Sequence, residues 1–130
     1  MPSSSARELM DRYPEVFRLR NAGIGAFRGI ECDDGWLPIL DKMCADLSGL
    51  TEVPAVFQIK EKFAELRCYF SGVASDGAYV IVGEAVAEAA KTCEVCGAPG
   101  SAVNVQGVYK TVCEEHRLAL EKRLSSRYNR

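Results

Sequence analysis

The chain has 130 residues, of which 48% are hydrophobic and 26% are charged, a composition typical of one globular domain. A formal net charge of −2 argues against generic binding to nucleic acid or to an anionic membrane. No segment approaches the roughly 18 apolar residues of a membrane span, and the opening MPSSSARELMDRYPEV is too polar for a secretory signal. We therefore expect an intracellular protein whose cysteines are metal ligands or buried thiols rather than disulfides.

The first half of the chain predicts two helices separated by a glycine-rich connection. The serines before Leu9 can cap a helix that Pro14 ends. The stretch NAGIGAFRGIECDDG is typical of an irregular connection or an edge strand. The segment DDGWLPILDKMCADLSGL predicts a stronger helix, with Asp34 as its N-cap, Pro38 in its first turn and Gly49 at its end.

The middle of the chain predicts a β-hairpin followed by a helix. Residues 55–60 and 66–70 are rich in β-branched and aromatic side chains, which favours two paired strands, and a turn at 71–72 ends the second strand. The segment SDGAYV predicts another turn. The alanine-rich YVIVGEAVAEAAKT then predicts a helix that runs to the first cysteine pair.

Four soft-metal ligands lie in two pairs toward the C-terminus. Cys93 and Cys96 have the spacing that lets one tight turn direct both sulfurs to the same point, and Cys113 and His116 repeat it. The pattern C-x₂-C-x₁₆-C-x₂-H supplies three thiolates and one imidazole, which fit tetrahedral Zn²⁺. Four protein ligands close the coordination sphere, so we expect a structural zinc ion. The alternative is a pair of free or redox-active thiols, but a thioredoxin-like C-x-x-C should open a helix after a strand.

These segments together predict an α+β fold in two parts. Residues 1–90 are expected to form an α+β core of N-terminal helices and a β-hairpin, and residues 91–130 a zinc-binding element packed on it as one cooperative unit. Between the ligand pairs, SAVNVQGVYKTV predicts a short hairpin, and a helix is expected to begin at Cys113. The order of knuckle, hairpin and helix is that of a treble-clef-like zinc element.

No catalytic residue is predicted. His116 is the only histidine, so its use as a metal ligand leaves no histidine to act as general base or to activate a nucleophile. The paired carboxylates of Asp33 and Asp34 support one alternative, a metal-dependent enzyme, although helix capping and solvation explain them more simply. The sequence implies no small-molecule substrate.

A second alternative is a nucleic-acid-binding accessory protein that uses the basic C-terminal helix. Residues 91–130 contain seven Lys/Arg against four Glu, whereas the first ninety residues are net acidic. The candidate nucleic-acid contacts are Lys110, Arg117, Lys122, Arg123 and Arg127.

The other cysteines, Cys32, Cys44 and Cys68, lack pair spacing, and we expect them to be buried thiols. We also expect Trp36, Tyr69 and Phe70 to belong to the core rather than to an interface, and Lys60, Glu61 and Lys62 to be solvated.

The segments VFQIKEKFAELRCYFSG, AEAAKTCEVCGAPG and TVCEEHR resemble a widespread family of small phage and prophage proteins. The shared pattern is a Lys-Glu-Lys-Phe hairpin, a short helix and a cysteine-rich zinc element, and it covers residues 36–117. Members often have Gly-Gly where this chain has Ala64-Glu65. The family carries no assigned activity. By association, the resemblance implies a non-catalytic interaction or regulatory protein that binds a host protein, such as host defence machinery, in the bacterial cytoplasm.

Overall fold

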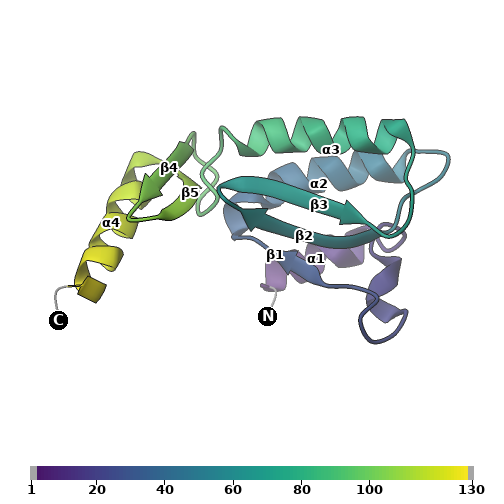
Figure 1. The fold of residues 1–130 in the computed structure, drawn as a ribbon. Helices are drawn as coiled ribbons and strands as arrows, with labels where there is room; N and C mark the ends of the chain where they lie inside the picture. The colour runs from purple at the N-terminus through teal and green to yellow at the C-terminus, as the bar shows by residue number, and fades with distance from the viewer. Residues whose placement is uncertain (1–2, 129–130) are drawn as a thin grey trace.

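The computed structural model describes residues 3–128, and over this range the chain is an α+β protein with four α-helices and two small sheets (Figure 1). The predicted α+β class is therefore confirmed. Within the same range, no helix combines the length and the apolar character needed to cross a membrane. The helices are α1 (Ser4–Arg12), α2 (Leu37–Ser48), α3 (Asp76–Ala89) and α4 (Glu114–Tyr128), and the strands are β1 (Gly29–Glu31), β2 (Val56–Lys62), β3 (Glu65–Phe70), β4 (Ser101–Val105) and β5 (Val108–Val112).

The two N-terminal helices lie where the sequence predicts them, with one difference at the start of α2. Ser3 caps α1 by accepting a hydrogen bond from the amide of Ala6. The predicted N-cap of α2 is wrong: Asp34 opens a short 3₁₀ turn, and Trp36 occupies the N-cap position instead. The physical reason lies elsewhere in the chain, because the amide of Gly35 donates to the carbonyl of Glu94 and holds this segment against the C-terminal part.

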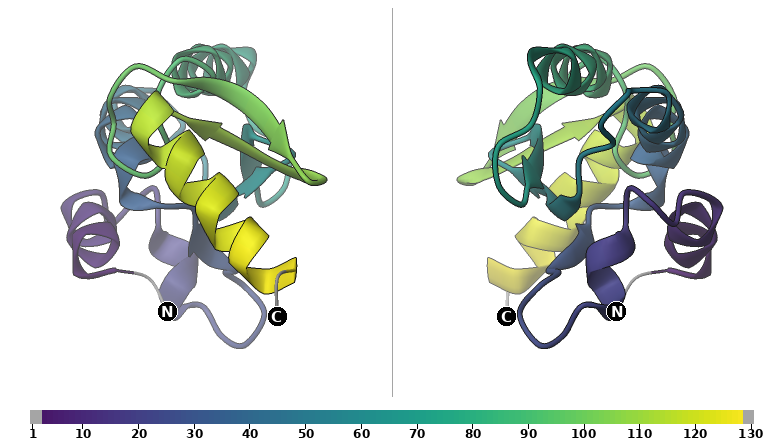
Figure 2. Two further views of the ribbon diagram at one scale, coloured as in Figure 1. Left: turned by 90° about the vertical axis from the view of Figure 1, so that its left-hand side faces the viewer. Right: turned by 90° about the vertical axis from the view of Figure 1, so that its right-hand side faces the viewer.

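The first sheet has the strand order β1-β2-β3, with β1 parallel to β2 and β2 antiparallel to β3. The glycine-rich stretch contains both predicted features: residues 22–28 form an irregular connection, and β1 is a short edge strand. Helices α1, α2 and α3 lie on one side of this sheet, and its other face carries no helix (Figures 1 and 2). The core therefore lies between the helices and the inner face of the sheet, and Trp36, Leu40, Ile59 and Leu66 are buried there.

The first hairpin is longer and turns more tightly than the sequence predicts. Strand β2 continues to Lys62, two residues beyond its expected end, so only the turn itself remains outside the strands. Phe63 and Ala64 form this turn with φ of 53° and 67°. Two consecutive positive φ angles are those of a type I′ turn, which usually needs Asn-Gly. Two hydrogen bonds hold the turn: Glu61 Oε2 accepts from the Ala64 amide at 2.7 Å, and Thr111 Oγ1 donates to the Ala64 carbonyl at 2.7 Å.

The strain in this turn predicts that Ala64→Gly raises the free energy of unfolding by about 1 kcal/mol, because glycine adopts positive φ without a steric penalty. Urea denaturation measures the change. Gly107→Ala is the matched control, since Gly107 has φ of 85° in the β4–β5 turn and should give a change of the opposite sign. A loss of stability in Ala64→Gly would contradict this account of the turn.

Helix α3 begins earlier than predicted, because the expected turn SDGAYV is wrong. Ser75 is its N-cap and accepts a hydrogen bond from the amide of Ala78, so the predicted turn is the first turn of the helix. Trp36 is fully buried, as predicted, and Phe70 packs against the core. Tyr69 is 40% exposed, so its expected place in the core is wrong.

The C-terminal element, residues 91–128, lies at one end of the first sheet and contains the β4–β5 hairpin and α4 (Figure 1). Long-range hydrogen bonds join it to the core. The Gly35 amide donates to the Glu94 carbonyl at 2.7 Å, and the Trp36 indole N–H donates to the Thr92 carbonyl at 2.9 Å. The residues just after the predicted boundary at residue 90 are therefore hydrogen-bonded to the core.

Candidate metal centre

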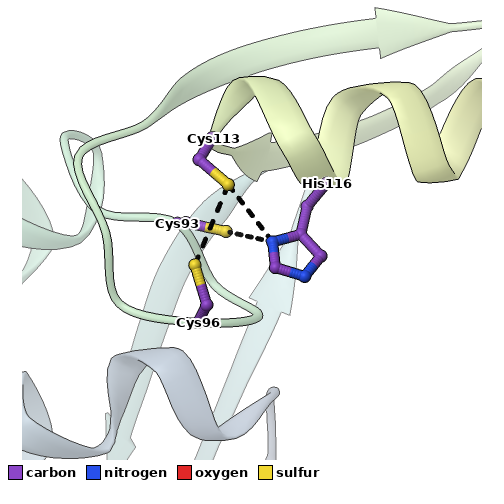
Figure 3. A group of neighbouring side chains, drawn as sticks. All are labelled: Cys93, Cys96, Cys113 and His116. Atoms are coloured by element: carbon purple, nitrogen blue, oxygen red, sulfur yellow. Dashed lines mark hydrogen bonds between the residues drawn. The ribbon is translucent and has the colours of Figure 1, made fainter.

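The side chains of Cys93, Cys96, Cys113 and His116 point toward one another (Figure 3), and their ligand atoms all lie within 4.8 Å of one another. Within residues 3–128, these four form the one group of three or more Cys, His, Asp or Glu side chains that lie close enough together to hold a metal ion. The four predicted ligands are thus assembled in one place from two distant segments.

A tight turn after α3 positions the first two ligands. The amide of Cys93 donates to the Ala98 carbonyl at 2.7 Å, and the amide of Gly97 donates back to the Cys93 carbonyl at 2.9 Å. Gly97 has φ of 82°, a conformation that glycine adopts without strain. The bonded turn fixes the sulfurs of Cys93 and Cys96 on the same side.

The start of α4 positions the other two ligands. Cys113 directly precedes the helix, and its carbonyl accepts the first helical hydrogen bond, from the amide of Arg117 at 2.8 Å. The imidazole of His116 lies on the same side, with Nδ1 3.2 Å from the sulfur of Cys113 and 3.6 Å from that of Cys93. The sulfurs of Cys96 and Cys113 are 3.8 Å apart, which closes the group.

The surroundings of Cys93 favour the thiolate form that binds metals. Burial by itself raises the pKa of this thiol, but the backbone amides of Cys113, Cys96 and Val95 donate to the sulfur and lower the pKa to about 6. A thiolate at neutral pH is the form that coordinates metal ions.

The redox alternative does not fit this arrangement. The C-x-x-C pair lies in a turn after α3 rather than at the start of a helix after a strand, where a thioredoxin-like pair would lie. The other three cysteines are buried or partly buried. Burial raises the pKa of Cys32 and of Cys68 to about 12, so these thiols are unreactive, in keeping with the prediction.

Asp33 and Lys110 form an ion-pair group with Glu94, the residue that follows the first ligand. Lys110 Nζ lies 3.0 Å from Asp33 Oδ2 and 3.2 Å from Glu94 Oε1, and the Asp33 amide donates to Glu94 Oε2 at 3.0 Å. The Glu94 side chain is 3% exposed, and burial raises its pKa although the Asp33 amide and Lys110 oppose the shift. Burial lowers the pKa of Lys110, but the two carboxylates outweigh it and leave that pKa raised. These groups connect β5 and the cysteine turn to the segment before α2.

The ion-pair group predicts that Lys110→Met lowers the free energy of unfolding by about 3 kcal/mol, because Glu94 stays buried without its cation. The double variant Glu94→Gln/Lys110→Met should regain at least half of that loss, since no buried charge remains. Urea denaturation with saturating metal measures both variants, and Lys122→Met is the control on an exposed lysine. Equal losses in the single and double variants would contradict the pairing.

The carboxylates considered for catalysis lie outside the metal centre. Asp34 Oδ1 accepts a hydrogen bond from the Ser3 hydroxyl at 2.8 Å, and Asp33 binds Lys110. Both line a cleft of about 970 Å³ beside β1. Within residues 3–128, they do not form part of a group that could hold a metal ion.

Two of the five predicted nucleic-acid contacts are paired with carboxylates in the structure. Lys110 belongs to the ion-pair group described above. Arg117 binds the carboxylates of Glu114 and Glu121 on its own helix. Lys122 and Arg123 are exposed, and the side chain of Arg127 lies outside the described residues. Nucleic-acid binding by α4 stays a prediction with two exposed cations to support it.

Sequence reasoning missed the contacts by which Gly35, Trp36 and Lys110 fix the centre to the core. Gly35 and Trp36 contact the cysteine turn directly, and Lys110 neutralises the acidic residue within it. The available signals were weak: a glycine before the tryptophan, and a lysine between a tyrosine and a threonine in the strand before Cys113.

No family model, curated protein or solved structure matches the chain. The resemblance to phage proteins therefore stays a prediction, and the functional conclusion depends on the geometry of the centre.

Proposed function

We propose that the protein is a zinc-stabilised, non-catalytic interaction or regulatory protein whose C-terminal element is a treble-clef-like zinc module. Two of the distances within the metal centre match those of a zinc site, and the third, 3.2 Å from the Cys113 sulfur to His116 Nδ1, is slightly shorter. Tetrahedral Zn²⁺ with Zn–S near 2.3 Å and Zn–N near 2.0 Å places two sulfurs about 3.8 Å apart and a sulfur and a nitrogen about 3.5 Å apart. The sulfurs of Cys96 and Cys113 are separated by 3.8 Å, and the Cys93 sulfur and His116 Nδ1 by 3.6 Å.

A structural rather than catalytic metal follows from the donor set. Three thiolates and one imidazole complete a tetrahedron, so no position remains for water or substrate. His116 is the only histidine, and its Nδ1 faces the sulfurs. The ion supplies folding free energy, and the chain's own residues hold it and fix it to the core.

The partner that we propose is a protein of the bacterial host, which the resemblance to phage proteins favours. Affinity purification of the tagged, zinc-loaded protein from a host lysate, with mass spectrometry, tests this. We expect one reproducible host protein that re-forms a complex of defined stoichiometry when both proteins are purified. Absence of any partner that survives reconstitution would contradict the proposal.

A further inference from the structure

The outer face of the first sheet carries a row of basic and aromatic side chains. Lys60 pairs with Arg67 across β2 and β3, and Lys62 lies two residues further along, so all three share one face. Ile59 and Leu66 alternate with them and are buried on the opposite face. We call the outer sheet face the surface formed by Lys60, Lys62, Phe63, Arg67, Tyr69 and Tyr109.

Three aromatic rings on this face are open to solvent. Phe63 is 67% exposed, Tyr109 46% and Tyr69 40%. The rings of Phe63 and Tyr109 meet edge to face with their centroids 5.9 Å apart, so the first hairpin and the C-terminal element contribute to one aromatic surface. Scattered exposed side chains are ordinary, but exposed rings that meet in one place are typical of an interaction surface.

The backbone at Phe63 makes its exposure more unusual. Its φ of 53° is in the left-handed region, which is costly for a bulky residue, and its side chain gains little burial in return. Strained positions of this kind concentrate at functional sites. Stability therefore favours a small residue at this position, and the aromatic ring needs another reason.

The cations on this face are available to a ligand. Neither Lys60 nor Lys62 forms an ion pair with any residue between 3 and 128, and each ammonium lies 5.7 Å from an aromatic ring, of Tyr69 and Phe63 respectively. Arg67 is paired with Glu65 at 3.1 Å. Glu31 pairs with Lys60 across β1 and β2, and Glu65 pairs with Lys62 across β2 and β3, so both carboxylates lie on the same face. They leave a small local excess of positive charge on a chain whose net charge is −2, so attraction of an anion is short-ranged.

We propose that the outer sheet face binds single-stranded nucleic acid through its phosphates and unpaired bases. Aromatic rings beside lysines on an open sheet are the groups that stack bases and neutralise phosphates without sequence preference. Aromatic residues and arginine are enriched in protein interfaces whereas lysine is depleted there, so it is the lysines that favour nucleic acid over a protein ligand on this face. A duplex hides its bases from such rings. Tyr69 and Phe63 are separated by about five residue steps, or about 17 Å, room for a few nucleotides.

Fluorescence anisotropy with oligothymidylate and oligouridylate of about 20 nucleotides tests the proposal on the zinc-loaded protein. We expect binding near 50 mM NaCl with a log–log salt slope of about −2, which three phosphate contacts give for a single strand. Binding of either oligonucleotide supports the proposal, and the one that binds more tightly shows whether the ligand is DNA or RNA.

Variants then locate the surface. Phe63→Asn keeps the left-handed turn and removes the ring, so affinity should fall roughly 5- to 150-fold while the melting temperature does not fall. Lys60→Ala/Lys62→Ala should reduce the salt slope to about −0.7. Lys122→Ala/Arg123→Ala removes two exposed cations from α4 and should leave affinity unchanged.

Four results would overturn the proposal: no binding near 50 mM NaCl, equal binding of a duplex, tighter binding of polyglutamate than of either oligonucleotide, or a loss of affinity in the α4 variant but not in the sheet variants. The proposed protein partner is tested separately, so its absence leaves these measurements unaffected.

Discussion

Replacing Cys113 with serine is expected to abolish stoichiometric zinc binding and to unfold the C-terminal element. The Cys113 sulfur lies 3.2 Å from His116 Nδ1 and 3.8 Å from the Cys96 sulfur, so its loss opens the centre on the helix side. Metal binding in structural zinc modules contributes folding free energy on the order of 10 kcal/mol. We therefore expect a loss of at least about 5 kcal/mol in the free energy of unfolding, enough to remove most of a typical domain's stability.

Thermal unfolding followed by circular dichroism, with elemental analysis of the same samples, measures this effect. Cys32→Ser is the matched control, because Cys32 lies outside the four-ligand group and should retain one zinc ion per chain. Chelation of wild-type protein should reproduce the defect of Cys113→Ser. Retention of wild-type stability in metal-free protein would show that the centre does not hold the element together.

Gly35→Ala is expected to separate the metal centre from the core even when zinc is present. A Cβ at this position would lie 2.4 Å from the carbonyl oxygens of both Cys93 and Glu94, and backbone atoms cannot move aside cheaply. The segment before α2 would move away from the cysteine turn. This movement would break the hydrogen bond from the Gly35 amide to Glu94 and the adjacent bond from Trp36 to Thr92. We expect a loss of about 3 kcal/mol or more.

Gly83→Ala provides the opposite case on an exposed stretch of α3, where an added Cβ meets no atom within 4 Å. Alanine is the better helix former, so this control should gain about 1 kcal/mol. The single tryptophan, Trp36, reports the contact, because it is fully buried in the intact protein. We expect a red-shifted emission in zinc-loaded Gly35→Ala only. Wild-type emission and stability in that variant would contradict the contact.

The ligands and the secondary structure of the C-terminal element were predictable because both depend on local spacing. The two-residue gap between Cys93 and Cys96 predicts a tight turn, and the gap between Cys113 and His116 predicts the first turn of a helix. Between the two pairs, apolar and polar residues alternate as they do in the strands of a hairpin. The predicted hairpin (residues 101–112) and helix correspond to β4, β5 and α4. The α+β class followed in the same way from periodicity within each segment.

The remaining features depend on contacts between distant segments, which one sequence does not display. The 3₁₀ turn before α2 exists because Gly35 meets Glu94, and the parallel pairing of β1 with β2 joins residues about thirty positions apart. The turn at Phe63 and Ala64 opposes local preference, since neither residue favours positive φ. A tertiary bond from the Thr111 hydroxyl holds it, together with a local bond from the Ala64 amide to Glu61.

The most direct test is a zinc K-edge X-ray absorption spectrum of the purified 130-residue protein. The account predicts one zinc ion per chain, bound by three sulfur atoms near 2.3 Å and one nitrogen near 2.0 Å with no further ligand. An oxygen atom in the first coordination shell would mark an open position where water or substrate can bind. That result, or a protein that purifies without zinc, would contradict a closed structural centre.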